Sequence, residues 1–148
     1  MLHRIMPTTY FLLLLLLSIG LHFLFPIFKF IYPPYTYFGY ILILFGVIVN
    51  IWADSILKKG KTTVKPHLMP TSLETGGPFR MSRHPMYLGM TAVLLGAAII
   101  HGSLIGLFFP ILFIIMMERI FIHDEEENLI KAFGQQYLDY KMRVRRWL

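Results

Sequence analysis

The sequence predicts an all-α membrane protein, a bundle of four transmembrane helices. Hydrophobic residues make up 56% of the 148 residues, which is above the usual share in soluble domains. These residues gather in four apolar runs, and a helix that crosses a bilayer needs roughly 20 apolar residues. Because backbone groups inside a bilayer must pair within the protein, the runs predict a helical bundle. The length suits a single domain over residues 1–148.

The first two predicted spans precede a long polar stretch. The first covers about residues 10–28. No small-x-small cleavage site follows it, so we interpret it as a retained span and not as a signal peptide. Pro33 and Pro34 then mark a turn, because proline lacks the backbone N–H and restricts the residue before it. The second span covers about residues 37–57.

The last two predicted spans cover about residues 86–100 and 104–122. The run over 86–100 is short for a full span. Between the two runs, His101, Gly102 and Ser103 predict a tight hairpin. The charged tail that follows has apolar residues at helical spacing, which predicts a C-terminal amphipathic helix.

The basic residues predict how the chain is oriented. Residues 58–84 and the C-terminal tail hold almost all of the 14 lysines and arginines. Cytoplasmic segments of membrane proteins carry such an excess, so we expect a multi-pass protein with the long loop and both termini in the cytoplasm. The excess also suits contact with anionic lipids. We therefore expect the lipid bilayer as a partner and no nucleic acid, with the oligomeric state left open.

One face of the third span carries small residues. Gly89, Ala92 and Gly96 recur at helical spacing. Small residues let membrane helices approach closely, which favours tight packing as the explanation. The alternative is that Gly89 leaves room for a ligand near the membrane boundary.

Charged side chains lie at the ends of the third and fourth spans. Arg83 and His84 precede Pro85, which suits the first turn of a helix. The unpaired N–H groups of that turn attract anions. Glu118 and Arg119 fall inside the fourth apolar run, where ionisable residues commonly mark a functional site.

Spacing links the fourth span to the acidic start of the tail. Glu118 and Glu125 are seven residues apart, as are Arg119 and Glu126. In a continuous helix each pair shares a face, which predicts a polar stripe from the bilayer into the cytoplasm. The alternative is an interfacial ion pair. The histidines show no metal-ligand spacing and the chain has no cysteine, so we expect no metal site.

Two sequence blocks carry a recognisable pattern. GPFRMSRHPMYLG, over residues 77–89, contains Arg-His-Pro-x-Tyr-x-Gly. EEENLIKAFGQQYLDYKMRV, over residues 125–144, contains Glu-Glu-x-x-Leu-x-x-x-Phe-Gly-x-x-Tyr-x-x-Tyr. Together they resemble the integral membrane methyltransferases, the family of isoprenylcysteine carboxyl methyltransferase and phospholipid N-methyltransferases.

This resemblance implies a pocket for S-adenosylmethionine, formed at the cytoplasmic boundary by the long loop and the C-terminal helix. The residues that it places around this cofactor are Arg83, His84, Tyr87, Gly89, Glu125 and Glu126. Glu118 and Arg119 lie deeper and are the expected catalytic residues on the acceptor side. The expected reaction is methyl transfer to a lipophilic or membrane-delivered small molecule, whose acceptor group (carboxylate, amine or thiol) is left open.

Two other functions are compatible with the same residues. The chain could be a non-enzymatic membrane scaffold or assembly protein, which predicts no cofactor pocket. A lesser alternative is a nicotinamide-dependent membrane reductase, because a related fold serves in membrane sterol reductases.

Overall fold

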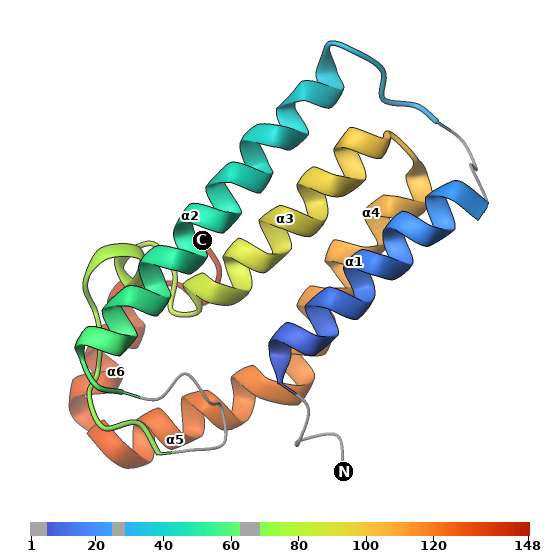
Figure 1. Cartoon of the computed structure of the whole chain (residues 1–148). Coiled ribbons are helices and arrows are strands. Elements are labelled where there is room, and N and C mark those ends of the chain that lie inside the picture. Colours follow the sequence, from blue (N-terminus) through green and yellow to red (C-terminus); the bar gives the residue numbers. More distant parts are fainter. Residues whose placement is uncertain (1–5, 25–28, 63–68) are drawn as a thin grey trace.

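The computed structural model describes residues 6–24, 29–62 and 69–148. In Figure 1 the long helices lie side by side as a bundle, and shorter helices cross one end of it. The described residues form no β-strand beyond an isolated bridge between Lys29 and Ser103. The predicted all-α class is therefore confirmed.

The helices are α1 (Pro7–Leu24), α2 (Phe38–Lys59), α3 (Pro85–His101), α4 (Leu104–Met117), α5 (His123–Phe133) and α6 (Gln135–Arg143). The 3₁₀ turns η2 (Tyr35–Tyr37) and η3 (Gly77–Arg80) lie before α2 and α3, and a π-helical turn η4 (Glu118–Ile122) joins α4 to α5.

Three of these helical stretches are long and apolar enough to cross a membrane. They are Pro7–Leu24, Tyr35–Lys59 and Leu104–Phe133, and α3 is a shorter apolar helix. The structure has helical elements over residues 37–57, 86–100 and 104–122, the ranges of three of the predicted spans. The first predicted span is helical up to Leu24, and its residues 25–28 lie outside the described part of the chain.

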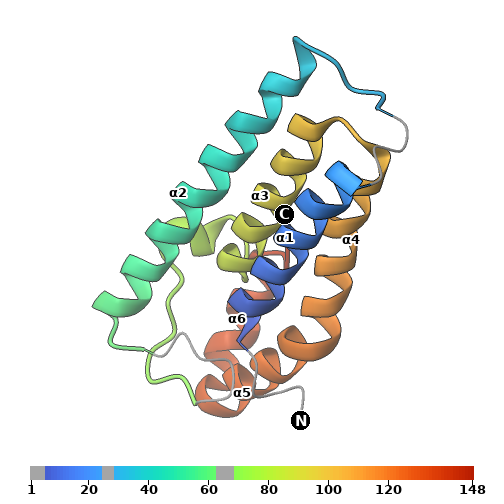
Figure 2. The ribbon, with the colours of Figure 1, turned by 45° about the vertical axis from the view of Figure 1, so that its right-hand side comes forward.

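Helix α3 lies in the middle of the bundle and packs against α1, α2 and α4 (Figure 2). Its contact with α2 depends on two pairs of glycines that face each other. A Cβ added at Gly96 would lie 2.5 Å from the carbonyl oxygen of Gly39, and one added at Gly89 would lie 2.7 Å from that of Gly46. The small-residue face of α3 therefore allows close packing against α2, which is the explanation that its spacing favours.

The core lies between α1, α3 and α4. Its fully buried side chains include Leu94, Phe113 and Met117. By contrast, the outer faces of α1 and α2 expose large apolar side chains, among them Leu16 and Ile41. Apolar faces of this extent suit a lipid environment and not water.

Two local features shape the ends of α3 and α4. Gly102 ends α3 with φ +67°, in the left-handed region, which confirms the predicted hairpin. At the other end the π turn η4 adds a residue to the helical repeat. As a result Arg119 is exposed whereas Glu126 is buried, so the shared face predicted for residues seven apart does not form.

Candidate functional site

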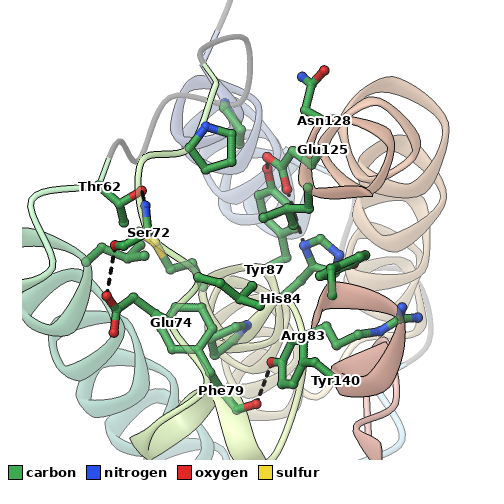
Figure 3. A pocket seen from close by; sticks show the side chains of 18 of the residues that line it. Thr62, Ser72, Glu74, Phe79, Arg83, His84, Tyr87, Glu125, Asn128 and Tyr140 are labelled. Carbon is green, nitrogen blue, oxygen red and sulfur yellow. Dashed lines mark hydrogen bonds and ion pairs between the residues drawn. The ribbon is translucent and has the colours of Figure 1, made fainter. Parts of the chain in front are cut away.

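A cavity of about 400 Å³ lies at the end of the bundle where α5 and α6 cross it (Figure 3). This volume falls in the range of small-molecule sites. Its walls come from the start of α1, the end of α2 with the loop after it, the start of α3, and α5 and α6. The lining residues used below are Thr8, Ser72, Glu74, Phe79, Arg83, His84, Met86, Tyr87, Met90, Glu125, Asn128, Tyr137 and Tyr140.

One polar wall of the cavity brings together the two sequence blocks. Nδ1 of His84 lies 3.2 Å from Oε2 of Glu125, and the hydroxyl of Tyr87 donates a hydrogen bond to Oε1 of the same carboxylate. The His84 and Tyr87 rings stack with their centroids 5.7 Å apart. Glu125 is thus held by two partners on α3 or directly before it, and 19% of its side chain stays exposed.

The local sequence explains how His84 reaches this position. Its backbone is non-helical, with φ −125° and ψ 62°, because Pro85 disfavours the helical region for the residue before it. Ser82 Oγ accepts a hydrogen bond from the backbone N–H of His84 at 3.1 Å. The helix then starts at Pro85, where a missing N–H costs nothing.

Behind this wall lies a buried ion network centred on Glu126. Nη2 of Arg83 lies 3.2 Å from its carboxylate, Nζ of Lys141 lies 3.3 Å away, and Arg146 approaches with two nitrogens at 3.0 Å each. Nε2 of His84 lies 3.5 Å from Oε1 of Glu126. Several cations therefore offset the cost of burying this carboxylate.

Arg83 contributes to this network more than to the cavity. Figure 3 shows its guanidinium pointing away from the wall that carries Ser72 and Glu74. Its Nε and Nη1 atoms are buried and have no hydrogen-bond partner among the described residues. The Tyr137 hydroxyl is buried beside this guanidinium.

Electrostatics favour a charged imidazole at His84. Burial lowers the pKa of His84, but the hydrogen bonds and negative charges of Glu125 and Glu126 outweigh this and raise it above 6.5. Burial, assisted by the charge of Glu126, raises the pKa of Tyr137 to about 12. The wall therefore combines an imidazole whose charged form is favoured, a carboxylate and phenols.

The long loop and the C-terminal helix form the remaining walls, as the resemblance implies, but the individual residues of these walls were not named as site residues from the sequence. Tyr140 donates a hydrogen bond to the carbonyl oxygen of Phe79 at 2.6 Å, which closes the cavity beside α6. On the opposite side Ser72 Oγ donates to Glu74 Oε1 at 2.9 Å. Asn128 completes the rim, one helical turn after Glu125. The tyrosine was part of the recognised pattern, but no periodicity signalled the loop residues.

A second, more open groove adjoins the cavity on the side of the apolar helices. It has a volume of about 390 Å³ and shares Thr8, Met86 and Met90 with the cavity. Its other lining residues come from the three helices α1, α2 and α3: Phe11, Val47, Asn50, Ile51, Asp54 and Val93. The two hollows thus meet at Met86 and Met90 on the first turns of α3.

Four predicted site residues are not among those that line the cavity: Glu126, which lies in the ion network behind the wall, Gly89, Glu118 and Arg119. Gly89 is at the contact with α2, where its missing side chain makes room for Gly46 and Asn50. Glu118 accepts a hydrogen bond from Trp147 Nε1 at 2.9 Å, and Arg119 is exposed on the π turn.

Comparison with known proteins finds relatives in both sequence and structure. One relative is an uncharacterized protein of Haemophilus influenzae, which is 36% identical over 63 residues. The matched stretch makes up 43% of this chain and all of that protein. The structure of the eukaryotic intramembrane Ras methyltransferase ICMT (isoprenylcysteine carboxyl methyltransferase) is similar, with a TM-score of 0.50 and 25% sequence identity. The match covers 95% of this chain, which spans about half, 51%, of that longer one.

The family model of the phospholipid methyltransferases matches residues 35–136. This stretch runs from the turn before α2 to the start of α6 and includes the polar wall formed by His84, Tyr87 and Glu125. The chain is a multi-pass membrane protein and belongs to the phospholipid methyltransferase family.

Proposed function

We propose that the protein transfers a methyl group from S-adenosylmethionine to a lipophilic acceptor at the cytoplasmic boundary of the membrane. The observation that carries the proposal is the cavity itself. A polar wall from both family blocks encloses one side, and a groove between apolar helices adjoins the other. A water-soluble donor and a lipid-soluble acceptor can thus approach one point from two directions.

The chemistry of the wall fits the donor. S-adenosylmethionine supplies an activated methyl group on a sulfonium, together with an ammonium, a carboxylate and ribose hydroxyls. Glu125 offers a partly exposed carboxylate for the ammonium or the hydroxyls. His84 lies beside it, and because its charged form is favoured it adds positive charge to this wall for the donor carboxylate. Arg83 and Glu126 support these two groups from the ion network behind the wall.

The rest of the cavity would position the reactants and exclude water. Methyl transfer is a displacement in line with the leaving group, so catalysis depends mainly on orientation. Met86 and Met90, where cavity and groove meet, provide an apolar junction between the two reactants. A dry site also favours a reaction in which positive charge is dispersed.

The groove supports a membrane-delivered acceptor. Its lining is mostly apolar, from Phe11 on α1 to Val93 on α3, with Asn50 and Asp54 as its polar groups on α2. An acyl or prenyl chain fits such a surface, and a polar head would then lie near Thr8 and the methionines. The basic residues at this end of the bundle support its placement in the cytoplasm.

Calorimetry with S-adenosylhomocysteine on the purified chain in detergent tests the donor site. Glu125→Gln should weaken binding roughly ten- to a hundredfold, because a hydrogen bond to a charged group contributes about 1.5–3 kcal/mol. Glu127→Gln is the matched control, since Glu127 lies on the same helix and its side chain is 52% exposed. Absence of binding by the wild-type chain would contradict the proposal and favour the scaffold alternative. Transfer of a labelled methyl group to membrane lipid extracts then tests turnover.

A further inference from the structure

Residues 145–148, called the strap below, contact both the segment before α3 and the π turn η4. Arg145 and Arg146 accept hydrogen bonds at their carbonyl oxygens, from the N–H of Arg83 at 3.0 Å and from Ser82 Oγ at 2.8 Å. The Trp147 side chain packs against the core and donates to Glu118. The strap thus joins the segment before α3 to the π turn, and it lies outside residues 35–136, which the family model matches.

Within the strap, Arg146 makes the most specific contact. Its Nε and Nη2 atoms each lie 3.0 Å from a different oxygen of Glu126. This two-point geometry fixes the plane of the carboxylate. Arg83 and Lys141 each bring a single nitrogen, at 3.2 and 3.3 Å. Arg146 therefore determines the orientation of Glu126 more than the other two cations do.

A chain of contacts leads from Arg146 to the cavity. Oε1 of Glu126 lies 3.5 Å from Nε2 of His84, and Nδ1 of His84 lies 3.2 Å from Glu125. The side chains of His84 and Glu126 are only 5% and 6% exposed, so solvent does not replace these contacts. Nε2 of His84 makes no hydrogen bond within the described part of the chain, so Glu126 acts on this side of the imidazole through its charge, and rotation of its carboxylate would weaken that ion pair.

We propose that Arg146 is a positioning residue, which acts through Glu126 to hold His84 and Glu125 in the orientation that binds the methyl donor. This inference rests on the proposed function. Arg146 itself does not line the cavity, so its effect on the donor passes through the Glu126 carboxylate that it binds.

The test compares the affinity for S-adenosylhomocysteine among variants of the full chain in detergent. Arg146→Gln should bind about tenfold more weakly, since a charge-assisted pair is lost beside a buried carboxylate. Arg146→Lys keeps the charge but lacks the planar fork and should bind with an intermediate affinity. Arg143→Gln is the matched control: it loses the same charge at an exposed position on α6 and should bind like the wild type.

A double-variant cycle separates positioning from general loss of structure. If Arg146 acts through Glu126, then Arg146→Gln should cost less than about twofold once Glu126 is already Gln. Independent losses that multiply would overturn the inference, and so would wild-type affinity in Arg146→Gln. Should Arg146→Gln not fold, the Lys variant decides: weaker binding supports the inference and unchanged binding overturns it. Absence of binding by the wild-type chain would overturn both this inference and the proposed function.

Discussion

Gly89→Ala distinguishes a glycine that serves helix packing from one that makes room for a ligand. In the structure the added Cβ would lie 2.7 Å from the carbonyl oxygen of Gly46 and would also collide with the Asn50 side-chain nitrogen. Asn50 Nδ2 donates a hydrogen bond to that carbonyl at 2.8 Å, so the added methyl group would collide with both partners of an existing hydrogen bond. The backbone of α2 must move for the variant to fold.

Overpacking of this kind costs about 1–3 kcal/mol. For a chain of this size each kcal/mol lowers the melting temperature by about 2–4 °C, so we expect a decrease of roughly 2–12 °C for Gly89→Ala. The measurement is thermal unfolding in detergent, followed by far-UV circular dichroism. At temperatures where the variant is folded, its affinity for S-adenosylhomocysteine should equal that of the wild type, because Gly89 lies outside the cavity.

Gly20→Ala is the matched control for this experiment. It makes the same change inside another apolar helix, but nothing lies within 4 Å of the added Cβ. Its melting temperature should stay the same or rise, since alanine favours the helix over glycine by up to about 1 kcal/mol. Two results would refute the reasoning. One is an unchanged melting temperature for Gly89→Ala, and the other is a stable Gly89→Ala variant that no longer binds the donor product.

Three further predictions concern pH, the acceptor and the topology. Because the pKa of His84 is raised in the folded state, its ion pairs stabilise the fold fully below pH 6.5 and less as the pH rises through the pKa of the folded state. The melting temperature of the wild type should therefore exceed that of His84→Gln at pH 6, and the difference between the two should be smaller at pH 9. Arg119 is exposed and lines neither hollow, so Arg119→Leu should leave methyl transfer to the native acceptor near the wild-type rate. A strong loss of turnover at unchanged donor affinity would instead support the acceptor-side role expected from the sequence. A reporter fused to the C-terminus should be active in the cytoplasm, and activity on the outer face alone would reverse the proposed orientation.

Much of the architecture could be predicted from the sequence because it depends on local properties. Hydropathy over about 20 residues identifies a span wherever the chain folds, and Pro85 starts a helix by its own geometry. That the two blocks with Arg83, His84, Glu125 and Glu126 meet in one site is implied by the resemblance to the membrane methyltransferases. These features need no knowledge of which helices are neighbours.

The tertiary structure decided which of these residues face the cavity. The π turn after Met117 rotates the following helix, so a spacing of seven residues no longer describes a shared face. Glu118 and Glu126, eight residues apart, both contact Arg146 instead. Glu125 is left as the acidic residue of α5 in the cavity wall.

Gly89 and the strap are two further cases in which the sequence alone does not decide the role of a segment. A small residue at the start of α3 suits either a ligand or a neighbouring helix, and only the position of α2 selects the helix. The segment after Val144 carries basic residues and a tryptophan that are typical of a membrane anchor. Its carbonyl groups bind residues more than 60 positions away, and the Arg146 side chain binds Glu126, which is 20 positions away. Composition and periodicity describe neighbours along the chain, whereas these contacts depend on how the helices pack.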